Sequence, residues 1–391
     1  MKPNTLDGVK MLHHDEMRNY DRIQGKIISV IMNHGCKIVE TPSFEDYDVY
    51  QHFFPHLRRQ MVKTVDTDGR VLVLRPDVTL PLVESAAREF PRPNQLLKFG
   101  YVSTVFREYF GRSTYGKDFL QGGIEILGDP SPSATARSSS WPRKSSRPSA
   151  SKTSASTSAP QRIRRPCSTP CPCRKRRRTG CGLSGRPQSR RPAPLSERLV
   201  PAGNARCALE ALPVLFGPYA QTLGKAKDYC LNSGMLNALA RLEKIYDYIL
   251  YAGFADKVQL DFGFASRLGY YTDMVFKVYV DGALYDVIDG GRYDTLSAQF
   301  GIDRPACGFG MNINLLYEFM NDAGLLAQAE PSFQLAVSYA ASDQVMVRDL
   351  MRWRSQGFRV AATPSRPLST AAITASTPYT AAARITRTAG P

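Results

Sequence analysis

The sequence contains no apolar stretch long enough to cross a membrane in its 391 residues. Residues 1–17 also lack the apolar core of a secretory signal peptide. Both absences predict a cytoplasmic protein with no membrane partner. A chain of this length leaves room for two or three domains.

A disulfide framework is also missing. Half of the eight cysteines are scattered among apolar neighbours: Cys36, Cys207, Cys230 and Cys307. These are typical of free thiols in a reducing compartment. The other half fall within one basic segment: Cys167, Cys171, Cys173 and Cys181. Their spacing, C-x3-C-x-C-x7-C, does not match the paired patterns of structural zinc, so we expect no metal site.

Outside one segment the chain lacks a net positive charge. The formal net charge is +16, but residues 131–206 carry 18 Lys and Arg against one acidic residue, Glu197. The rest of the chain sums to −1, or to −4 without the three arginines of the tail from Pro364. A mildly acidic body does not favour a nucleic-acid-binding surface. The alternative of a basic RNA-binding factor therefore rests only on that segment.

Residues 131–206 also have almost no aromatic or branched apolar side chains. Such a segment cannot bury enough surface to offset the entropy of ordering it, so we predict that it does not fold as written. Our hypothesis is that it is an out-of-frame translation, with the frame restored near Arg206. As an alternative, the RKRRR run at 174–178 resembles a nuclear-localisation or nucleic-acid patch. The tail after Thr363 has a similar composition, which suggests a second frameshift.

The most informative stretch that is present runs from Leu74 to Leu127. In it, β-branched and aromatic runs alternate with polar residues, which predicts antiparallel strands with inward polar side chains. These polar residues are Asp77, Thr79, Arg107, Lys117, Gln121 and Glu125. A covered polar sheet face needs a ligand or internal partners. We therefore expect these residues to form the floor of a pocket.

Apolar periodicity predicts the main helices and strands around this stretch. An amphipathic helix is expected over 11–33, ending at Gly35, and a second helix is marked by a Leu and Ile stripe that stops at Gly253. The expected strands of the second half are 258–264, 274–280 and 283–287. Residues 333–360 follow a small β-α-β pattern.

Several phrases stand in a characteristic order: LRPDVT (74–79), FRE (106–108), QGGIE (121–125), LGYYTDMVF (268–276), DGGRYDTL (289–296) and ACGFGMNINLL (306–316). Together they resemble the catalytic core of class II aminoacyl-tRNA synthetases, closest to histidyl-tRNA synthetase and its paralogue, the regulatory subunit of ATP phosphoribosyltransferase. The resemblance implies an α+β fold, an antiparallel sheet flanked by helices. The expected division is a core in two parts, 1–130 and 207–330, around the segment 131–206. A C-terminal α/β remnant follows at 331–391.

The phosphate-binding cations of the resembled synthetase are largely missing. It uses three arginines, of which only Arg107 has a counterpart here. Ser266 stands in the second position, with Arg267 one place along, and Leu315 stands in the third, next to Asn314 where the family has an acid. Fixed guanidinium groups stabilise the charge of adenylate formation, so their loss predicts no adenylation, no catalytic residues and no cofactor.

The amino-acid half of the resembled pocket is retained. The resemblance implies histidine binding by Asp77, Thr79, Arg107, Gln121, Glu125, Tyr270 and Tyr271. Retained binding without catalysis is the profile of the regulatory subunit, which implies the short-form catalytic subunit as partner and histidine as effector. A homodimer within a hetero-oligomer is implied by the first motif, around Pro42 and Glu45. The alternative function is an active histidyl-tRNA synthetase.

The frameshift hypothesis has a direct test. Resequencing the gene should restore, in another frame between codons 131 and 206, a protein sequence with the apolar periodicity of a folded core. Confirmation of the present frame would contradict the hypothesis.

Overall fold

The computed structural model describes residues 11–54, 57–108, 116–140, 203–254, 257–264, 269–280, 285–326, 335–340 and 344–365, together with the backbone of 151–157. These divide into two compact units, 1–325 and 326–391, which are described separately. The four cysteines of the basic segment and the tail from Arg366 lie outside the described residues.

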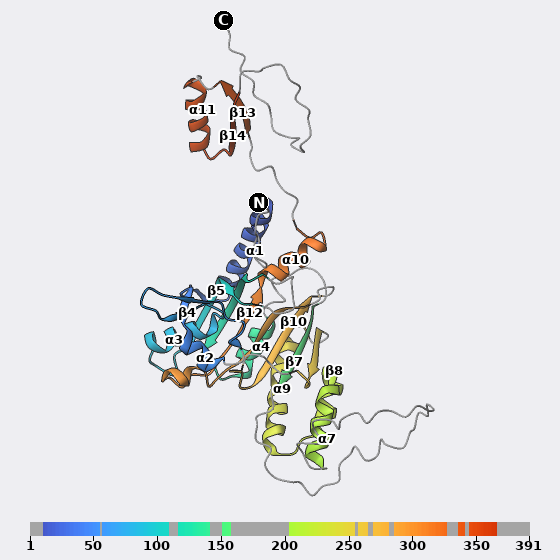
Figure 1. The fold of residues 1–391 in the computed structure, drawn as a ribbon. Coiled ribbons are helices and arrows are strands. Elements are labelled where there is room, and N and C mark those ends of the chain that lie inside the picture. The colour runs from blue at the N-terminus through green and yellow to red at the C-terminus, as the bar shows by residue number, and fades with distance from the viewer. Residues whose placement is uncertain are drawn as a thin grey trace, which may run out of the picture. The chain divides into compact units, whose positions relative to one another are not determined.

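The first unit is built on a large mixed sheet (Figure 1). Its strands follow the order β1-β5-β6-β12-β11-β10-β7-β9-β8. Their bounds are β1 Lys37–Ile38, β5 Leu97–Phe106, β6 Asp118–Leu127, β7 Ser151–Thr157, β8 Phe216–Pro218, β9 Val258–Asp261, β10 Met274–Val280, β11 Asp286–Arg292 and β12 Ala306–Asn312. The pairs β1–β5 and β7–β9 are parallel, and the others are antiparallel. The predicted α+β class with an antiparallel core of strands is confirmed.

Helices and a smaller sheet cover this large sheet. The helices are α1 His14–Asn33, α2 Tyr47–Phe53, α3 Thr79–Glu89, α4 Pro132–Ser140, α7 Asn204–Ala211, α8 Tyr219–Lys227, α9 Ser233–Tyr251 and α10 Ile313–Asp322, with 3-10 turns η3 Leu212–Val214 and η5 Ser297–Phe300. The smaller sheet has the order β2-β4-β3, with bounds β2 Phe44–Asp46, β4 Val71–Leu74 and β3 Lys63–Val65. The predicted helix ends are confirmed, because Gly35 and Gly253 both adopt positive φ.

Two hydrophobic cores lie on the two faces of the sheet. On one face Ile124 and Ile126 of β6 pack in one cluster with Leu242 and Ile245 of α9. On the other face Tyr101, Leu127 and Tyr293 pack in a second cluster with Val83 of α3. Successive side chains of a strand point to opposite faces, so β6 contributes to both cores. The second face also carries the polar residues discussed below.

The helix α4 departs from the prediction that 131–206 is unfolded. It packs against α9, β11 and β12, and its residues Thr135, Ser138 and Ser139 are buried. Their hydroxyls have partners, since Ser138 Oγ donates to Ala134 O (3.0 Å) and Thr135 Oγ1 accepts from Arg292 Nη1 (3.2 Å). Small side chains with satisfied hydroxyls allow close helix-to-sheet packing. The composition alone did not indicate this.

The backbone of β7 also lies inside the same segment. It pairs antiparallel with β10 and parallel with β9, and so joins β9 and β8 to the rest of the sheet. The sheet therefore runs through a stretch that composition predicts to be unstructured, because backbone hydrogen bonding alone can place a strand between two partners.

The second unit is a small α/β element. Its strands β13 Leu335–Ala340 and β14 Val360–Ser365 pair in parallel, and α11 Gln344–Ser355 connects them. Met346 and Leu350 of α11 pack with Val337 in a small core. This arrangement follows the β-α-β pattern predicted for 333–360.

Candidate functional site

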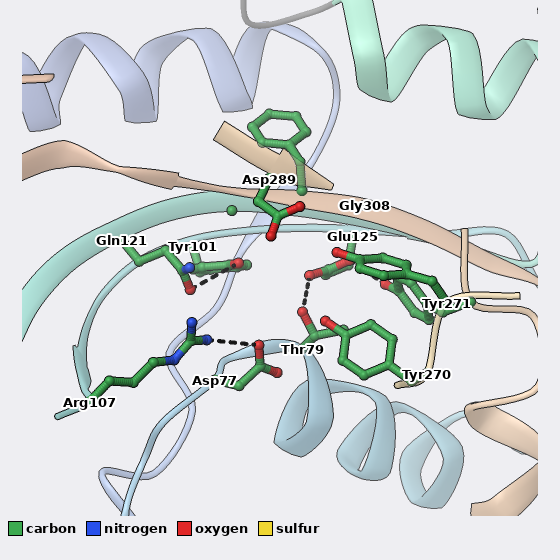
Figure 2. A pocket seen from close by; sticks show the side chains of 13 residues that line it. Asp77, Thr79, Tyr101, Arg107, Gln121, Glu125, Tyr270, Tyr271, Asp289 and Gly308 are labelled. Carbon is green, nitrogen blue, oxygen red and sulfur yellow. Dashed lines mark hydrogen bonds and ion pairs between the residues drawn. The ribbon is translucent and has the colours of Figure 1, made fainter. Parts of the chain in front are cut away.

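A pocket lies on the α3 side of the large sheet, where β5, β6, β11 and β12 present alternate residues to it (Figure 2). On β6 these residues are Gln121 and Glu125, and the strand register places Glu125 opposite Gly308 of β12. The free space within the pocket, counting its mouth, is about 380 Å³. It is lined by Asp77, Thr79, Tyr101, Arg107, Gln121, Glu125, Tyr270, Tyr271, Asp289, Tyr293, Gly308, Phe309 and Gly310.

All seven residues of the predicted histidine-binding set line this pocket. Lys117, which the sequence pattern placed with them, does not line it; Lys117 Nζ pairs with Glu108 Oε1 at 3.2 Å near the surface. The prediction missed Tyr101, Asp289 and Tyr293. Two of these lie in the DGGRYD phrase, which sequence alone also allowed to be a turn between strands.

Asp77 stands at the start of α3, where the chain leaves the small sheet. Its Oδ1 accepts the Leu80 backbone N–H at 3.0 Å, which caps the first turn of the helix. Its Oδ2 lies 3.5 Å from Arg107 Nη2. Both groups are largely buried, so this ion pair is shielded from solvent. Burial raises the pKa of Asp77, and the Arg107 charge opposes that rise.

Buried Arg75 fixes the position of Asp77. Its guanidinium donates to the Thr104 carbonyl of β5 through Nε (3.1 Å) and Nη2 (2.9 Å) and to Thr41 Oγ1 at 2.9 Å. One side chain thus links the entry of α3 to two other segments of the chain. The LRPDVT phrase therefore supports the pocket through Arg75 and lines it through Asp77 and Thr79.

Glu125 is buried at the centre of the pocket floor with both carboxyl oxygens occupied. Thr79 Oγ1 donates to Oε1 at 2.7 Å, and Tyr293 OH donates to Oε2. Burial raises the pKa of Glu125 to about 8, although these two hydrogen bonds lower it; the charge of Asp77 raises it further. The group is therefore mostly protonated at neutral pH.

Tyr270, Tyr271 and Tyr293 form an aromatic wall beside Glu125. The Tyr270 ring lies 4.8 Å from that of Tyr271 and 5.5 Å from that of Tyr293, centre to centre. Burial raises the pKa of each phenol well above its usual value, so all three remain uncharged hydrogen-bond donors. This end of the pocket suits a flat ring with polar edges.

Glycines in the strands create the space that these side chains fill. A Cβ at Gly308 would overlap the Glu125 carboxylate and the backbone oxygen of Ile124. A Cβ at Gly310 would lie 2.5 Å from Gln121 Nε2, and one at Gly291 would lie 2.7 Å from the Tyr271 ring. The glycine-rich phrases of β11 and β12 thus determine the depth of the pocket.

The described lining contains a single cation, Arg107. The two positions where the resembled synthetase has further arginines hold Ser266 and Leu315 here, and neither side chain is charged. Leu315 N–H donates to Asn312 Oδ1 (3.1 Å) in the first turn of α10, and Asn314 Oδ1 accepts from the Leu120 N–H (2.9 Å). Ser266 and Arg267 lie outside the described residues.

Within the described ranges, no group of three or more His, Cys, Asp or Glu side chains is placed to hold a metal ion. In the same part of the chain, no helix combines the length and the apolar character needed to span a bilayer.

A family model described as histidyl-tRNA synthetase matches residues 8–140 and 195–316, more than half of the chain. The chain belongs to the histidyl-tRNA synthetase family. The match leaves out 141–194, the central part of the basic segment.

Curated relatives within this family carry a more specific name. The chain is 27% identical over 330 residues to the ATP phosphoribosyltransferase regulatory subunit of Clostridium acetobutylicum, covering 82% of this chain and 80% of that protein. It is 25% identical over 355 residues to the protein of the same name from Alkaliphilus metalliredigens, covering 90% and 89%. The predicted resemblance to such regulatory subunits is confirmed.

Solved structures confirm the fold. The structure titled ATP phosphoribosyltransferase regulatory subunit/histidyl-tRNA synthetase from Bacillus halodurans has a TM-score of 0.72 at 22% identity, covering 95% of both chains. Apo histidyl-tRNA synthetase from S. aureus has a TM-score of 0.61 at 18% identity, covering 92% of this chain and 83% of that one. The class II synthetase-like architecture predicted from the sequence is therefore present.

The glycine geometry predicts the effect of adding one methyl group. Gly308→Ala should lower the free energy of unfolding by about 1–3 kcal/mol, because the methyl overlaps Glu125 and rigid backbone. The matched control is Gly25→Ala in α1, where an added Cβ meets nothing within 4 Å and should stabilise by up to about 1 kcal/mol. Chemical denaturation measures both, and equal effects of the two substitutions would contradict the packing argument.

Glu125 also predicts how stability depends on pH. Its pKa is about 8 in the folded chain against 4.5 as the reference, so the folded state holds a proton that the unfolded state has lost between these values. Stability from this group is complete below about pH 4.5 and is lost as pH rises through 8, at about 1.4 kcal/mol per unit of pKa difference. Asp289, with a pKa raised to about 6 by burial, adds a slope of the same sign at lower pH.

Glu125→Gln should therefore flatten the decline in unfolding free energy between pH 5 and 8, measured by denaturant titration at several pH values. The exposed Glu243→Gln is the control with the same chemical change, and it should keep the wild-type slope. An unchanged slope in Glu125→Gln would show that another group controls the pH response.

Proposed function

We propose that this chain is a non-catalytic regulatory subunit of ATP phosphoribosyltransferase, which assembles with the short-form catalytic subunit and binds histidine as effector in the pocket. The observation that carries the proposal is the charge of the pocket. Its single described cation, Arg107, is already paired with Asp77, while two further carboxyl groups, Glu125 and Asp289, face the same space. A polyphosphate needs several fixed cations. The described pocket lining supplies only Arg107, which already pairs with Asp77.

The amino-acid half of the pocket supports histidine as the ligand. The aromatic wall of Tyr270, Tyr271 and Tyr293 borders a carboxyl group that can exchange hydrogen bonds with ring nitrogens. Nearby, Gln121 offers an amide, and Tyr101 OH lies 3.5 Å from its Oε1. A small molecule with one flat polar ring and one amino group matches these partners.

Self-association of the chain is part of this proposal. Phe44 of β2 is 57% exposed, and beside it Glu45 Oε1 is buried without a hydrogen-bond partner. Burial raises the pKa of Glu45 to about 7, and the charge of Glu84 adds to this rise. An exposed aromatic ring on an edge of the small sheet is a surface that a second copy could cover.

The alternative function is an active histidyl-tRNA synthetase. It is supported by the structural similarity to the solved synthetases and by the retained amino-acid half of the pocket. The lack of further described cations argues against it. The two functions differ in what they do with ATP.

Mixing the purified chain with the short catalytic subunit of the same organism should give one larger species on size exclusion. It should raise or confer phosphoribosyl transfer to ATP, and histidine should inhibit the assembled complex. Separate elution together with full unassisted activity of the catalytic subunit would contradict the regulatory assignment.

Histidine-dependent exchange between ATP and pyrophosphate, measured on the same preparation, should stay at background, because the described pocket has no unengaged cation for the phosphates. Clear exchange would instead support the synthetase alternative. A known synthetase assayed in parallel is the positive control.

A further inference from the structure

The end of helix α2 contacts two residues of the pocket lining, although no residue of α2 lines the pocket itself. The buried side chains Tyr50 and Phe54 lie four residues apart in the chain and therefore on one side of this segment. Tyr50 OH donates to the backbone carbonyl of Asp77 at 3.1 Å. The Phe54 ring packs edge-on against the Tyr270 ring, with the ring centres 5.5 Å apart. One side of α2 thus touches both the acidic and the aromatic part of the pocket.

The backbone carbonyl of Asp77 needs a donor that helix α3 cannot supply. In a helix the N–H four residues further along donates to a carbonyl, but here that residue is Pro81, which has no N–H. The backbone between them is already helical, since Val78 has φ −94° and ψ −25° and α3 follows it directly. A buried carbonyl without a donor is costly. The Tyr50 hydroxyl takes the place of the missing N–H.

The backbone before α3 is held by side chains from outside the helix. The carbonyl of Pro76 accepts from Arg107 Nε, and the next carbonyl, that of Asp77, accepts from Tyr50 OH. Because each residue has only two soft backbone angles, fixing two successive carbonyls restricts the direction of the side chain between them. Tyr50 acts on the second of the two, which belongs to Asp77 itself.

The direction of the Asp77 side chain matters because its carboxylate can still accept donors. A carboxylate has about four acceptor positions, and the contacts of Asp77 with the backbone of α3 and with Arg107 do not use all of them. Asp77 lines the cavity, and in the view of Figure 2 it lies between Arg107 and Tyr270. A small rotation of its backbone would move these acceptor positions relative to a bound molecule.

We propose that Tyr50 is a positioning residue for the ligand site: its hydroxyl fixes the backbone of Asp77, so that the Asp77 carboxylate faces the ammonium group of the ligand. Phe54, on the same side of α2, holds Tyr270 against the ring of the ligand. The inference rests on the proposed function in taking that ligand to be histidine. Helix α2 thus determines the separation between the two parts of the pocket without contacting the ligand.

Tyr50→Phe tests this role, because it removes one hydroxyl and keeps the ring. The variant should bind L-histidine roughly three- to tenfold more weakly than the wild type, the scale of one ordinary hydrogen bond. Isothermal titration of the full chain, below its unfolding temperature, measures the affinity. A residue that only stabilised the fold would leave the affinity of the folded population unchanged at that temperature.

The matched control is Tyr219→Phe. The Tyr219 hydroxyl is also buried, but among the described residues it has no hydrogen-bond partner, and its ring stacks on Tyr246 in the core on the other face of the sheet. The same chemical change at this position should leave the affinity for L-histidine as it is in the wild type.

Pro81→Ala provides a rescue that packing alone would not give. It adds an N–H at residue 81, in helical backbone, that can donate to the Asp77 carbonyl in place of Tyr50. The double variant Tyr50→Phe/Pro81→Ala should therefore bind L-histidine as tightly as Pro81→Ala alone. A loss in Tyr50→Phe that Pro81→Ala does not restore would overturn the role of the carbonyl contact.

The outcomes separate this inference from the proposed function. A folded Tyr50→Phe that binds L-histidine as the wild type does overturns the role of Tyr50 and leaves histidine binding intact. Failure of the wild type to bind L-histidine overturns both. If Tyr50→Phe alone does not fold, the comparison of Pro81→Ala with the double variant decides in the same way. If neither Tyr50 variant folds, Tyr50 serves folding only and its positioning role is overturned.

Discussion

The pocket depends on the burial of three carboxyl groups, Asp77, Glu125 and Asp289, on one face of the large sheet. A buried acid must be paired, protonated or bound, because an unpaired charge in that environment costs several kcal/mol. Two of the three pocket acids meet this constraint in different ways, and the third does not meet it fully. Asp77 is paired with Arg107, Glu125 is held largely protonated between Thr79 and Tyr293, and Asp289 retains an oxygen without a partner. The one cation of the described lining, Arg107, is thus already paired with Asp77.

Much of this site could be predicted from the sequence because its residues lie in short phrases. QGGIE places Gln121 and Glu125 by local pattern, since alternation along a strand decides which side chains share a face, and LRPDVT places Asp77 directly before helix α3. Tyr293 and Asp289 could not be placed in the same way. Their position depends on the pairing of β11 with β12 and β10, which joins segments distant in sequence, and no local pattern reports that register.

The fold was predictable where apolar periodicity was strong and unpredictable where the sequence has few apolar residues. The stripe of α9 predicted the buried residues Leu239, Leu242 and Ile245, while Leu236, in the same stripe, is 49% exposed near the helix start. Helix α4 was not predicted, and the physical reason lies in its side chains. A helix of Ala, Thr and Ser has little hydrophobic signal, yet its small side chains pack closely and its hydroxyls bond to the backbone and to Arg292.

The strand β6 serves two environments at once, since Gln121 and Glu125 face the pocket while Ile124 and Ile126 face the opposite core. Whether a β6 side chain faces the pocket or the opposite core therefore depends on whether its residue number is odd or even. Deleting or inserting one residue within β6 would exchange the two sets. Gln121 and Glu125 would then face the hydrophobic core, and the isoleucines would face the pocket. In this strand a change of length is thus far more harmful than most changes of residue type, and gaps in it should be rare among functional relatives.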